Sequence, residues 1–347
     1  QRIPLDSIAY EEADIMLAVR YLDQLAQREG KPLVICMALG SNTGGHTGEN
    51  ALSLYLNYVC RKVGRAVAVA AGNEGNKGHH YFGVVPRDQD YTEVELRVGA
   101  EEKGFQVNLW GNAPDLFSVE VIAPSGEKIP RFVARKLDRQ RYDFVFESTI
   151  LDIQYELSEI VSGDQRLLLA FQNPTPGIWM IRVYAEGNLE NTFHMWLPVT
   201  GFISDETYFL RPDPDTTVTE PGNAEGVLTF SGYDARNGSI WYDSGRGYTR
   251  NGRIKPDLAA PAVEVAAVGL RGRVTTLTGS SAAAALGAGA CALLLEWGIV
   301  RGNVPAMDSI TIQRYLIRGA NRLNIFDYPN KTWGYGSLDL YDAFRSV

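Results

Sequence analysis

The chain has 347 residues, a length that fits two domains or one large domain carrying an insertion. Hydrophobic residues make up 45% and charged residues 21% of the sequence, which argues against disordered, collagen-like and coiled-coil proteins. The net charge is -8, from 33 basic and 41 acidic residues, and it disfavours nucleic acid as a partner. No apolar run approaches the length of a membrane span, so we expect no membrane-spanning segment.

The first part of the chain predicts an α/β layer. A helical period of apolar residues covers about 8–29 and ends at Gly30. An unbroken apolar run at 33–38, a second helix over about 49–63 and a second apolar run at 66–71 follow. Apolar runs without alternation are typical of strands buried on both faces of a parallel sheet, so helices and parallel strands should alternate here.

The pattern changes at about residue 86. Apolar and polar residues alternate over 93–98, 105–109 and 178–185, which indicates half-exposed antiparallel strands. Turn sequences rich in Gly, Pro and Asn separate these strands. Many short strands with this spacing predict a β-sandwich, which we expect over 86–222.

The α/β pattern returns after the predicted sandwich. A strand at 227–230 is followed by a buried Ala- and Leu-rich helix over about 281–297 and a helix near 310–318. We therefore predict an α/β core with a parallel sheet, interrupted by an inserted all-β sandwich at a surface loop. The predicted domains are a first core part at 1–85, the sandwich at 86–222 and a second core part at 223–347.

The sequence contains three cysteines, Cys36, Cys60 and Cys291, and each has apolar neighbours. None belongs to a C-x-x-C pair or lies near a histidine at metal-ligand spacing. We therefore expect three buried, reduced thiols with no disulfide, metal or nucleophilic role.

Two segments carry side chains suited to acyl-transfer chemistry. Asn73 follows the break of a buried strand at Gly72, at the sheet edge where ligands of α/β proteins bind, and its amide can donate to an oxyanion. Ser281 begins a helix, at the positive end of the helix dipole, which suits a nucleophile. Taken singly, Ser281 also fits a helix-capping residue and Asn73 a turn residue.

Two further segments, Ser244–Gly247 and Lys255–Pro261, lie between Asn73 and Ser281 in the sequence. In chain order, the segments around Asn73, these two segments and the segment around Ser281 resemble three signatures of subtilisin-like serine proteases: A-A-G-N-x-G, S-x-R-G-x-T…K-P-D-x-x-A-P and G-T-S-x-A. All three signatures occur in the family's order, and the resemblance covers about 5–85 and 223–345. It implies a serine endopeptidase that hydrolyses peptide bonds through an acyl-enzyme and needs no cofactor.

By this resemblance Ser281 is the nucleophile and Asn73 is the oxyanion donor. The residues it assigns to substrate binding are Ala38, Leu39, Gly40 and Gly72. The first three would form the strand edge that pairs with the backbone of a peptide or protein substrate, and the segment 41–48 would border the same cleft.

The chain departs from the family pattern in two ways. Ser280 stands where Thr is usual and Ala285 where Pro is usual, and neither change removes the Ser281 hydroxyl. The family's catalytic Asp, which lies in a D-[ST]-G motif, and its catalytic His should both precede residue 1. Asp243-Ser244-Gly245 has the letters of that motif, but it lies far from the motif's usual place in the family's order, so we interpret it as a coincidence. Because Gln1 is neither an initiator methionine nor the start of a signal peptide, we interpret the chain as the C-terminal portion of such a protease. We expect the N-terminal part of the same protease as its partner, and we expect this chain alone to be inactive.

The predicted sandwich resembles the jelly-roll-like insert of clostridial subtilases that are associated with spore germination, with its P-T-P-G-x-W strand. This resemblance implies a spore-associated or extracytoplasmic location. The residues themselves do not indicate a compartment.

The four histidines do not supply the missing base. His46 lies in a Gly-rich loop beside the presumed cleft, where it either contacts substrate or is a solvated loop residue. His79 and His80 closely follow Asn73, and adjacent histidines in a loop are usually exposed. His194 lies within a predicted sandwich strand and is interpreted as structural.

Three functions remain open. The first is an active serine endopeptidase completed by its N-terminal part, and the second is a pseudoprotease that binds or scaffolds in spore germination signalling. The third is a carbohydrate-binding sandwich supported by the core, which the absence of an aromatic row disfavours. Glu74, Asp243 and Asp257 lack the spacing of a calcium-binding loop, so no metal ligand is assigned.

Overall fold

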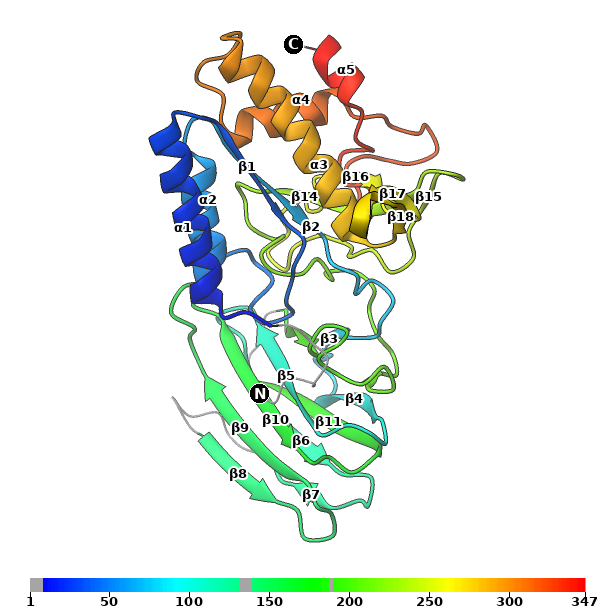
Figure 1. The fold of residues 1–347 in the computed structure, drawn as a ribbon. Coiled ribbons are helices and arrows are strands. Elements are labelled where there is room, and N and C mark those ends of the chain that lie inside the picture. Colours follow the sequence, from blue (N-terminus) through cyan, green and yellow to red (C-terminus); the bar gives the residue numbers. More distant parts are fainter. Residues whose placement is uncertain (1–8, 132–138, 187–189, 347) are drawn as a thin grey trace. The chain divides into compact units, whose positions relative to one another are not determined.

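In the computed structural model, which describes residues 9–131, 139–186 and 190–346, the chain divides into two units (Figure 1). The β unit contains Lys77–Pro214, and the α/β unit combines Tyr10–Asn76 with Asp215–Val347. In chain order the β unit therefore lies between the two parts of the α/β unit. It begins before residue 86, where the sequence analysis placed its start, because β3 (His80–Val84) pairs with a strand of this unit.

The sheet of the α/β unit is built mainly from parallel strands. β1 (Leu33–Met37) pairs with β2 (Arg65–Ala70), β2 pairs with β14 (Leu228–Asp234), and β14 pairs with β16 (Leu258–Pro261). The short β15 (Ser239–Ile240) pairs antiparallel with β14. The apolar runs that predicted parallel strands are confirmed, and β1 forms one edge of the described sheet.

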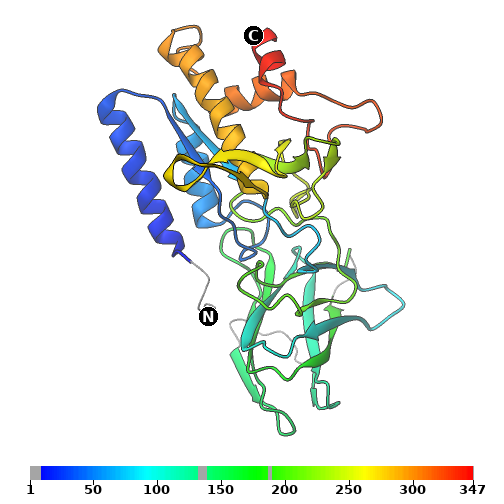
Figure 2. The same cartoon turned by 45° about the vertical axis from the view of Figure 1, so that its right-hand side comes forward.

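The helices of this unit are α1 (Glu12–Glu29), α2 (Ala51–Cys60), α3 (Ser280–Leu295), α4 (Ser309–Gly319) and α5 (Leu340–Arg345). α1 and α2 cover one face of the sheet, and α3 and α4 cover the other (Figures 1 and 2). Successive side chains of a strand point to opposite faces, so Val67 and Val69 of β2 pack with α1 and α2. Ala66 and Ala68 of the same strand pack with α3 and α4, where their small side chains admit the helices closely. The sheet is thus buried on both faces, and sites can form only at its edges and strand ends.

α3 continues into a π-helical segment, η2 (Glu296–Val300), so Ser280–Val300 is one apolar helix of 21 residues. By length and composition alone it passes as a membrane span, although the sequence analysis found no apolar run of that length, and a single such helix is weak evidence for a span. The helix packs against the sheet through residues such as Leu294, and core helices of α/β proteins pass the same test. Its opposite face exposes Leu286 by 41% and Leu293 by 52%.

A hairpin of β17 (Val265–Val268) and β18 (Val274–Leu277) completes the α/β unit, with the short 3₁₀ turn η1 (Leu270–Gly272) between the strands. The hairpin exposes large apolar side chains, among them Val268 and Val274. A soluble domain rarely leaves such a group uncovered, so this face is a candidate contact surface.

The β unit contains two antiparallel sheets, with the strand orders β3-β12-β5-β10-β9-β8 and β13-β4-β11-β6-β7. Its other strands are β4 (Tyr91–Val98), β5 (Gly104–Gly111), β6 (Leu116–Ile122), β7 (Lys128–Ile129), β8 (Arg139–Asp143), β9 (Ile150–Glu156), β10 (Gln165–Gln172), β11 (Gly177–Glu186), β12 (Thr192–Trp196) and β13 (Tyr208–Phe209). The alternation that predicted antiparallel strands over 93–98, 105–109 and 178–185 is confirmed by β4, β5 and β11.

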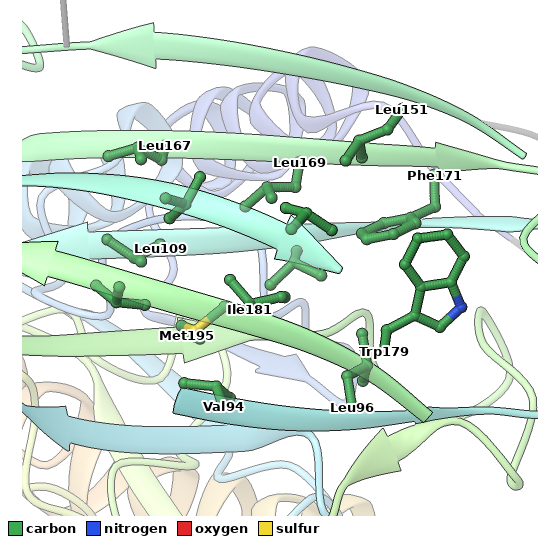
Figure 3. Packing of buried hydrophobic residues seen from close by; sticks show 14 of the residues in the cluster. Val94, Leu96, Leu109, Leu151, Leu167, Leu169, Phe171, Trp179, Ile181 and Met195 are labelled. Carbon is green, nitrogen blue, oxygen red and sulfur yellow. The ribbon is translucent and has the colours of Figure 1, made fainter. Parts of the chain in front are cut away.

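The two sheets of the β unit share one buried cluster (Figure 3). Trp179 and Ile181 of β11 pack with Leu109 of β5 and Leu169 of β10, which belong to the other sheet. The Trp179 indole N–H donates to the Thr175 carbonyl over 2.9 Å, so the ring is buried without losing its hydrogen bond. This unit therefore has a hydrophobic core of its own.

Two of the three cysteines are buried as expected. Burial raises the pKa of Cys60 and of Cys291 to about 12, which keeps both thiols protonated. Cys36 is exposed, contrary to the expectation. Its strand, β1, has a described neighbour on one side only, so an apolar sequence neighbourhood does not ensure burial there.

Candidate active site

Asn73 lies at the carboxyl edge of the sheet, shortly after β2 ends at Ala70. The chain turns at Gly72, whose φ of 91° favours glycine. A Cβ atom at this position would lie 2.6 Å from Cγ2 of Thr219, so a larger residue would not fit without displacing that side chain. The turn leaves the Asn73 side chain exposed.

Ser281 lies in the first turn of α3. Gly279 precedes the helix with a φ of 146°, Ser280 is buried, and Ser281 is exposed. The first N–H groups of a helix have no partner within it, so the Ser281 N–H and hydroxyl lie at the positive end of the helix dipole. Negative charge that develops at this position is stabilised.

Hydrogen bonds join the start of α3 to the Asn73 turn. The Ser280 N–H and hydroxyl both donate to Asn73 Oδ1, over 3.0 and 2.8 Å. The Gly72 N–H in turn donates to Ser280 Oγ over 3.1 Å. Because Oδ1 is held as an acceptor, the Asn73 amide is oriented with Nδ2 left to donate elsewhere. The sequence analysis recorded Ser280 only as a replacement for Thr and missed this bond.

Two donors flank Gly279. A Cβ atom built there would lie 3.6 Å from Asn73 Nδ2 and 3.9 Å from the Ser281 nitrogen. The amide and the N–H therefore border the same small space, which the missing side chain keeps open. Two such donors can hold the oxyanion of a tetrahedral intermediate, which is the role that the sequence predicts for Asn73.

The predicted substrate segment lies at the same edge of the sheet. β1 ends at Met37, and Ala38, Leu39 and Gly40 follow it with exposed residues outside any strand ladder. β1 and β2 are parallel neighbours, so the chain after β1 leaves the sheet at the same edge as the Asn73 turn. An extended peptide could therefore reach this segment and the donors together.

The S-x-R-G segment supports the Asn73 turn through its main chain. The Gly245 N–H donates to the Gly72 carbonyl over 2.9 Å, and the Gly75 N–H donates to the Asp243 carbonyl over 3.0 Å. Asp243 thus has a structural position in the α/β unit.

The K-P-D segment forms a buried ion pair. Lys255 Nζ lies 2.7 Å from Asp257 Oδ2, and both side chains are almost fully buried. The same ammonium donates to the Val227 carbonyl, and the carboxylate also accepts from the Thr229 N–H and from Gln313 Nε2. Because its charges and hydrogen bonds are satisfied internally, this pair is a structural element of the core.

His46 is fully buried, so neither the substrate-contact nor the solvated-loop expectation is right. Its Nδ1 lies 2.9 Å from the Val218 carbonyl and its Nε2 lies 3.4 Å from the Asn42 carbonyl. Both ring nitrogens therefore face main-chain carbonyls, and the ring fixes the loop that follows β1.

His79 and His80 are also buried, against the expectation of exposed loop residues. The reason is that His80 begins β3 and pairs with the end of β12. His80 Nε2 lies 2.9 Å from His194 Nδ1, and the His80 ring stacks on Trp196. The structural interpretation of His194 agrees with this arrangement within the β unit.

Glu74, Asp243 and Asp257, which the sequence analysis considered as metal ligands, do not form a metal-binding group in the part of the chain that the structure describes. Among the residues that the structure describes, no three His, Cys, Asp or Glu side chains form a group suited to a metal ion. Glu74 is buried, and Asp257 is paired with Lys255.

Glu220 is a buried carboxyl group that the sequence analysis missed. Oε1 accepts from the Gly48 N–H over 3.3 Å and Oε2 accepts from the Ser53 hydroxyl over 3.1 Å. Burial raises the pKa of Glu220 to about 7, although these donors and Asn223 act in the opposite direction. Its main chain also pairs with Ser41 in both directions. No local sequence signal marks this residue, since its partners lie far away in the chain.

Comparisons with known proteins identify the family of this chain. The subtilase family, Peptidase S8, matches residues 160–336. The solved structure of the Clostridium perfringens CspB protease is 30% identical and superposes with a TM-score of 0.90, covering 97% of this chain and 70% of that one. The prenylagaramide maturation protease PagA is 25% identical over 38% of this chain and 46% of its own, with a TM-score of 0.32. No curated protein sequence matches. The family match spans more than half of the chain, and the CspB protease matches nearly all of it, so the chain belongs to the subtilase family of serine proteases.

Proposed function

We propose that this chain carries the nucleophile and the oxyanion hole of a subtilisin-type serine endopeptidase. The observation that carries the proposal is the Ser280–Asn73 hydrogen-bonded link, which sets an oriented amide beside the exposed Ser281 at a helix N-terminus. Family membership supports a serine protease function.

The chemistry follows from these positions. A base removes the proton of Ser281 Oγ as the oxygen attacks the carbonyl carbon of the scissile peptide bond. The carbonyl oxygen becomes an oxyanion, which accepts hydrogen bonds from Asn73 Nδ2 and the Ser281 N–H. Collapse of the intermediate breaks the C–N bond, and the protonated base gives its proton to the leaving amine. Water then hydrolyses the acyl-enzyme by the same steps.

The base and its orienting carboxylate would come from further polypeptide, the N-terminal part of the same protease. Both ring nitrogens of His46 already face main-chain carbonyls. The match to the CspB protease covers 70% of that chain, so the related protease contains more polypeptide than is matched here. Leu286 and Leu293 on α3 and Val274 on the hairpin are exposed and apolar, as expected of a face that another segment covers.

We further propose that the β unit is a jelly-roll-like β-sandwich inserted into the protease, and that the protease acts in spore germination. Two antiparallel sheets around one hydrophobic cluster support the first part. The second part rests on the resemblance to clostridial germination subtilases alone.

The test compares this chain with the complete protease in a reaction with a serine-directed phosphonate. We expect stoichiometric labelling of Ser281 in the complete protease only, with none in the Ser281→Ala variant. Thiol labelling of Cys36 provides a separate measure of docking, because the N-terminal part should protect this edge-strand residue. If the complete protease binds its N-terminal part but Ser281 stays unlabelled, the protein is a pseudoprotease and the endopeptidase proposal is wrong.

A further inference from the structure

We propose that the β unit binds a calcium ion between the loop after β5 and the chain that enters β12, through side-chain oxygens of Asp115 and Asn191. The inference does not depend on the protease chemistry, because both residues belong to the β unit and neither is part of the candidate active site. The sequence analysis assigned no metal ligand in this unit.

The two ligand residues lie at one end of the sheet that contains β5, β10 and β12. Gly111, the last residue of β5, pairs with Gln165 at the start of β10 and with Phe193 near the start of β12. The loop 112–115 and the chain at 190–191 are therefore neighbours at this end of the sheet, although they are far apart in the sequence.

Asp115 is in direct contact with Asn191. Its Oδ2 accepts a hydrogen bond from the Asn191 N–H over 2.8 Å, and each residue is only 5% exposed. The second carboxylate oxygen, Asp115 Oδ1, is buried and accepts no hydrogen bond from the described residues. The same holds for the side-chain oxygen of Asn191. Two touching side chains thus each hold a buried oxygen that lacks a donor.

A positive partner would relieve this arrangement. Burying an acceptor without a donor is unfavourable, and the cost is greatest for a carboxylate oxygen. Each of the two oxygens has less than 1 Å² of surface open to water. A calcium ion lies about 2.3 to 2.6 Å from its oxygen ligands, closer than the ~2.8 Å of a hydrogen-bonded water. A bare cation therefore needs less room beside these oxygens than a water molecule does.

The donor set selects the kind of cation. A carboxylate oxygen beside an amide oxygen suits a hard cation rather than a transition metal. Calcium accepts irregular coordination, which main-chain carbonyls and water would complete, whereas magnesium demands a near-ideal octahedron and gives up its water reluctantly. The site has one carboxylate, so it is compatible with the absence of a group of three His, Cys, Asp or Glu among the described residues. It also predicts a weak Kd of about 10⁻⁴ to 10⁻³ M.

The loops at this end of the sheet are acidic. The loop 157–164 leads into β10 and is joined to the loop 112–115 by the Ala113 N–H, which donates to Asp164 Oδ1 over 2.9 Å. Together with 190–191 these segments contain no lysine or arginine and four acidic residues, namely Asp115, Glu159, Asp164 and Glu190. Their negative potential attracts a cation to the two buried oxygens.

The experiment measures calcium binding to the complete protease by calorimetry, and its melting temperature in about 10 mM calcium chloride and in EDTA at equal ionic strength. We expect a calcium ion bound with a Kd of about 10⁻⁴ to 10⁻³ M and a melting temperature about 2 to 5 °C higher with calcium. Magnesium at the same concentration should give less than about a third of this shift.

Two variants should change the result in opposite directions. Asp115→Asn keeps an oxygen for the Asn191 N–H but removes the charge, so it should abolish the calcium-dependent shift and be at least as stable as the wild type in EDTA. Asn191→Asp adds a carboxylate, so it should lower the Kd by about 10-fold and lower the melting temperature in EDTA. The φ of 53° at Asn191 is one that Asp also tolerates.

Asp143→Asn is the matched control. Asp143 is exposed and lies at the opposite end of the same sheet, where its partner Ile150 pairs with the last residue of β10. This variant should keep the calcium-dependent shift of the wild type. A shift that is equal in the wild type and Asp115→Asn would overturn the proposal. If Asp115→Asn does not fold, calcium binding by Asn191→Asp that is no tighter than that of the wild type would overturn it as well.

Discussion

The buried Glu220 should make the protein less stable as the pH rises, and Glu220→Gln should remove this dependence. The ordinary pKa of 4.5 is raised to about 7 in the folded chain because the carboxyl group is buried. Hydrogen bonds from Gly48 and Ser53 stabilise the charged form but do not offset the loss of water, and the negative charge of Glu12 acts in the same direction as burial.

The magnitude follows from the two pKa values. A folded pKa about 2.5 above the unfolded one corresponds to about 3 kcal/mol, at about 1.4 kcal/mol per pKa unit. The protonated carboxyl is favoured by folding, so this contribution is fully present below about pH 4.5. It is lost as the pH rises through about 7.

The assay is urea unfolding of the wild type, Glu220→Gln and the exposed control Glu225→Gln between about pH 4.5 and pH 8. The free energy of unfolding of the wild type, relative to Glu220→Gln, should fall by about 3 kcal/mol over this range. Other titrating groups act in all three proteins and cancel in the difference. A difference between wild type and Glu220→Gln that stays constant within about 0.5 kcal/mol would refute the reasoning.

Three other predictions concern the active site, the core and the sheet edge. In the complete protease, Asn73→Ala should lower kcat by about 10² to 10³ with little change in KM. Ser280→Ala should lower kcat by about 10-fold, because the Asn73 amide is no longer held in its orientation. Unchanged kcat values, measured after active-site titration, would contradict both roles. Lys255→Met should cost about 3 to 5 kcal/mol in urea unfolding because Asp257 is left charged and buried, and Lys255→Met with Asp257→Leu should recover most of it. Cys36 should react with a thiol reagent in the native chain while the two buried thiols react only after unfolding, as counting the modified cysteines by mass spectrometry will show.

Features with a local periodic signal could be predicted from the sequence. α1 ends at Gly30, which adopts the left-handed conformation that glycine favours, so a glycine after a helical period marked this end. In β11 the side chains of one face are buried, which is why its sequence alternates between apolar and polar residues. The motif order placed Asn73 and Ser281 correctly at a strand end and at a helix start.

Features that depend on distant partners could not be predicted in this way. Glu220 and His46 are polar residues whose burial arises from contacts with segments about 170 residues away, and no local pattern encodes such contacts. The exposure of Cys36 depends on which strand lies beside β1, which its own apolar neighbours do not reveal. Ser280 was visible in the sequence, but its bond to Asn73 spans 207 positions.

The ends of the β unit lie side by side, and this affects how the rest of the chain folds. The Asp213 N–H donates to the His80 carbonyl over 2.9 Å, and His80 Nδ1 lies 3.0 Å from the Asp213 carbonyl, although the residues are 133 positions apart. Joining β2 to β14 across an unfolded segment of that length carries a large loop-closure entropy, which falls by about 0.6 kcal/mol for each halving of the loop. A β unit that folds first, with His80 beside Asp213, shortens the connection from β2 to β14 to the segments 71–79 and 214–227. This is between two and three halvings of the loop, so it removes about 1.5 kcal/mol of the loop-closure cost from the assembly of the parallel sheet. Ser281 and Asn73, encoded on opposite sides of this unit, are then separated by about 75 positions of chain instead of the full length that includes the β unit, so the site assembles over a shorter loop.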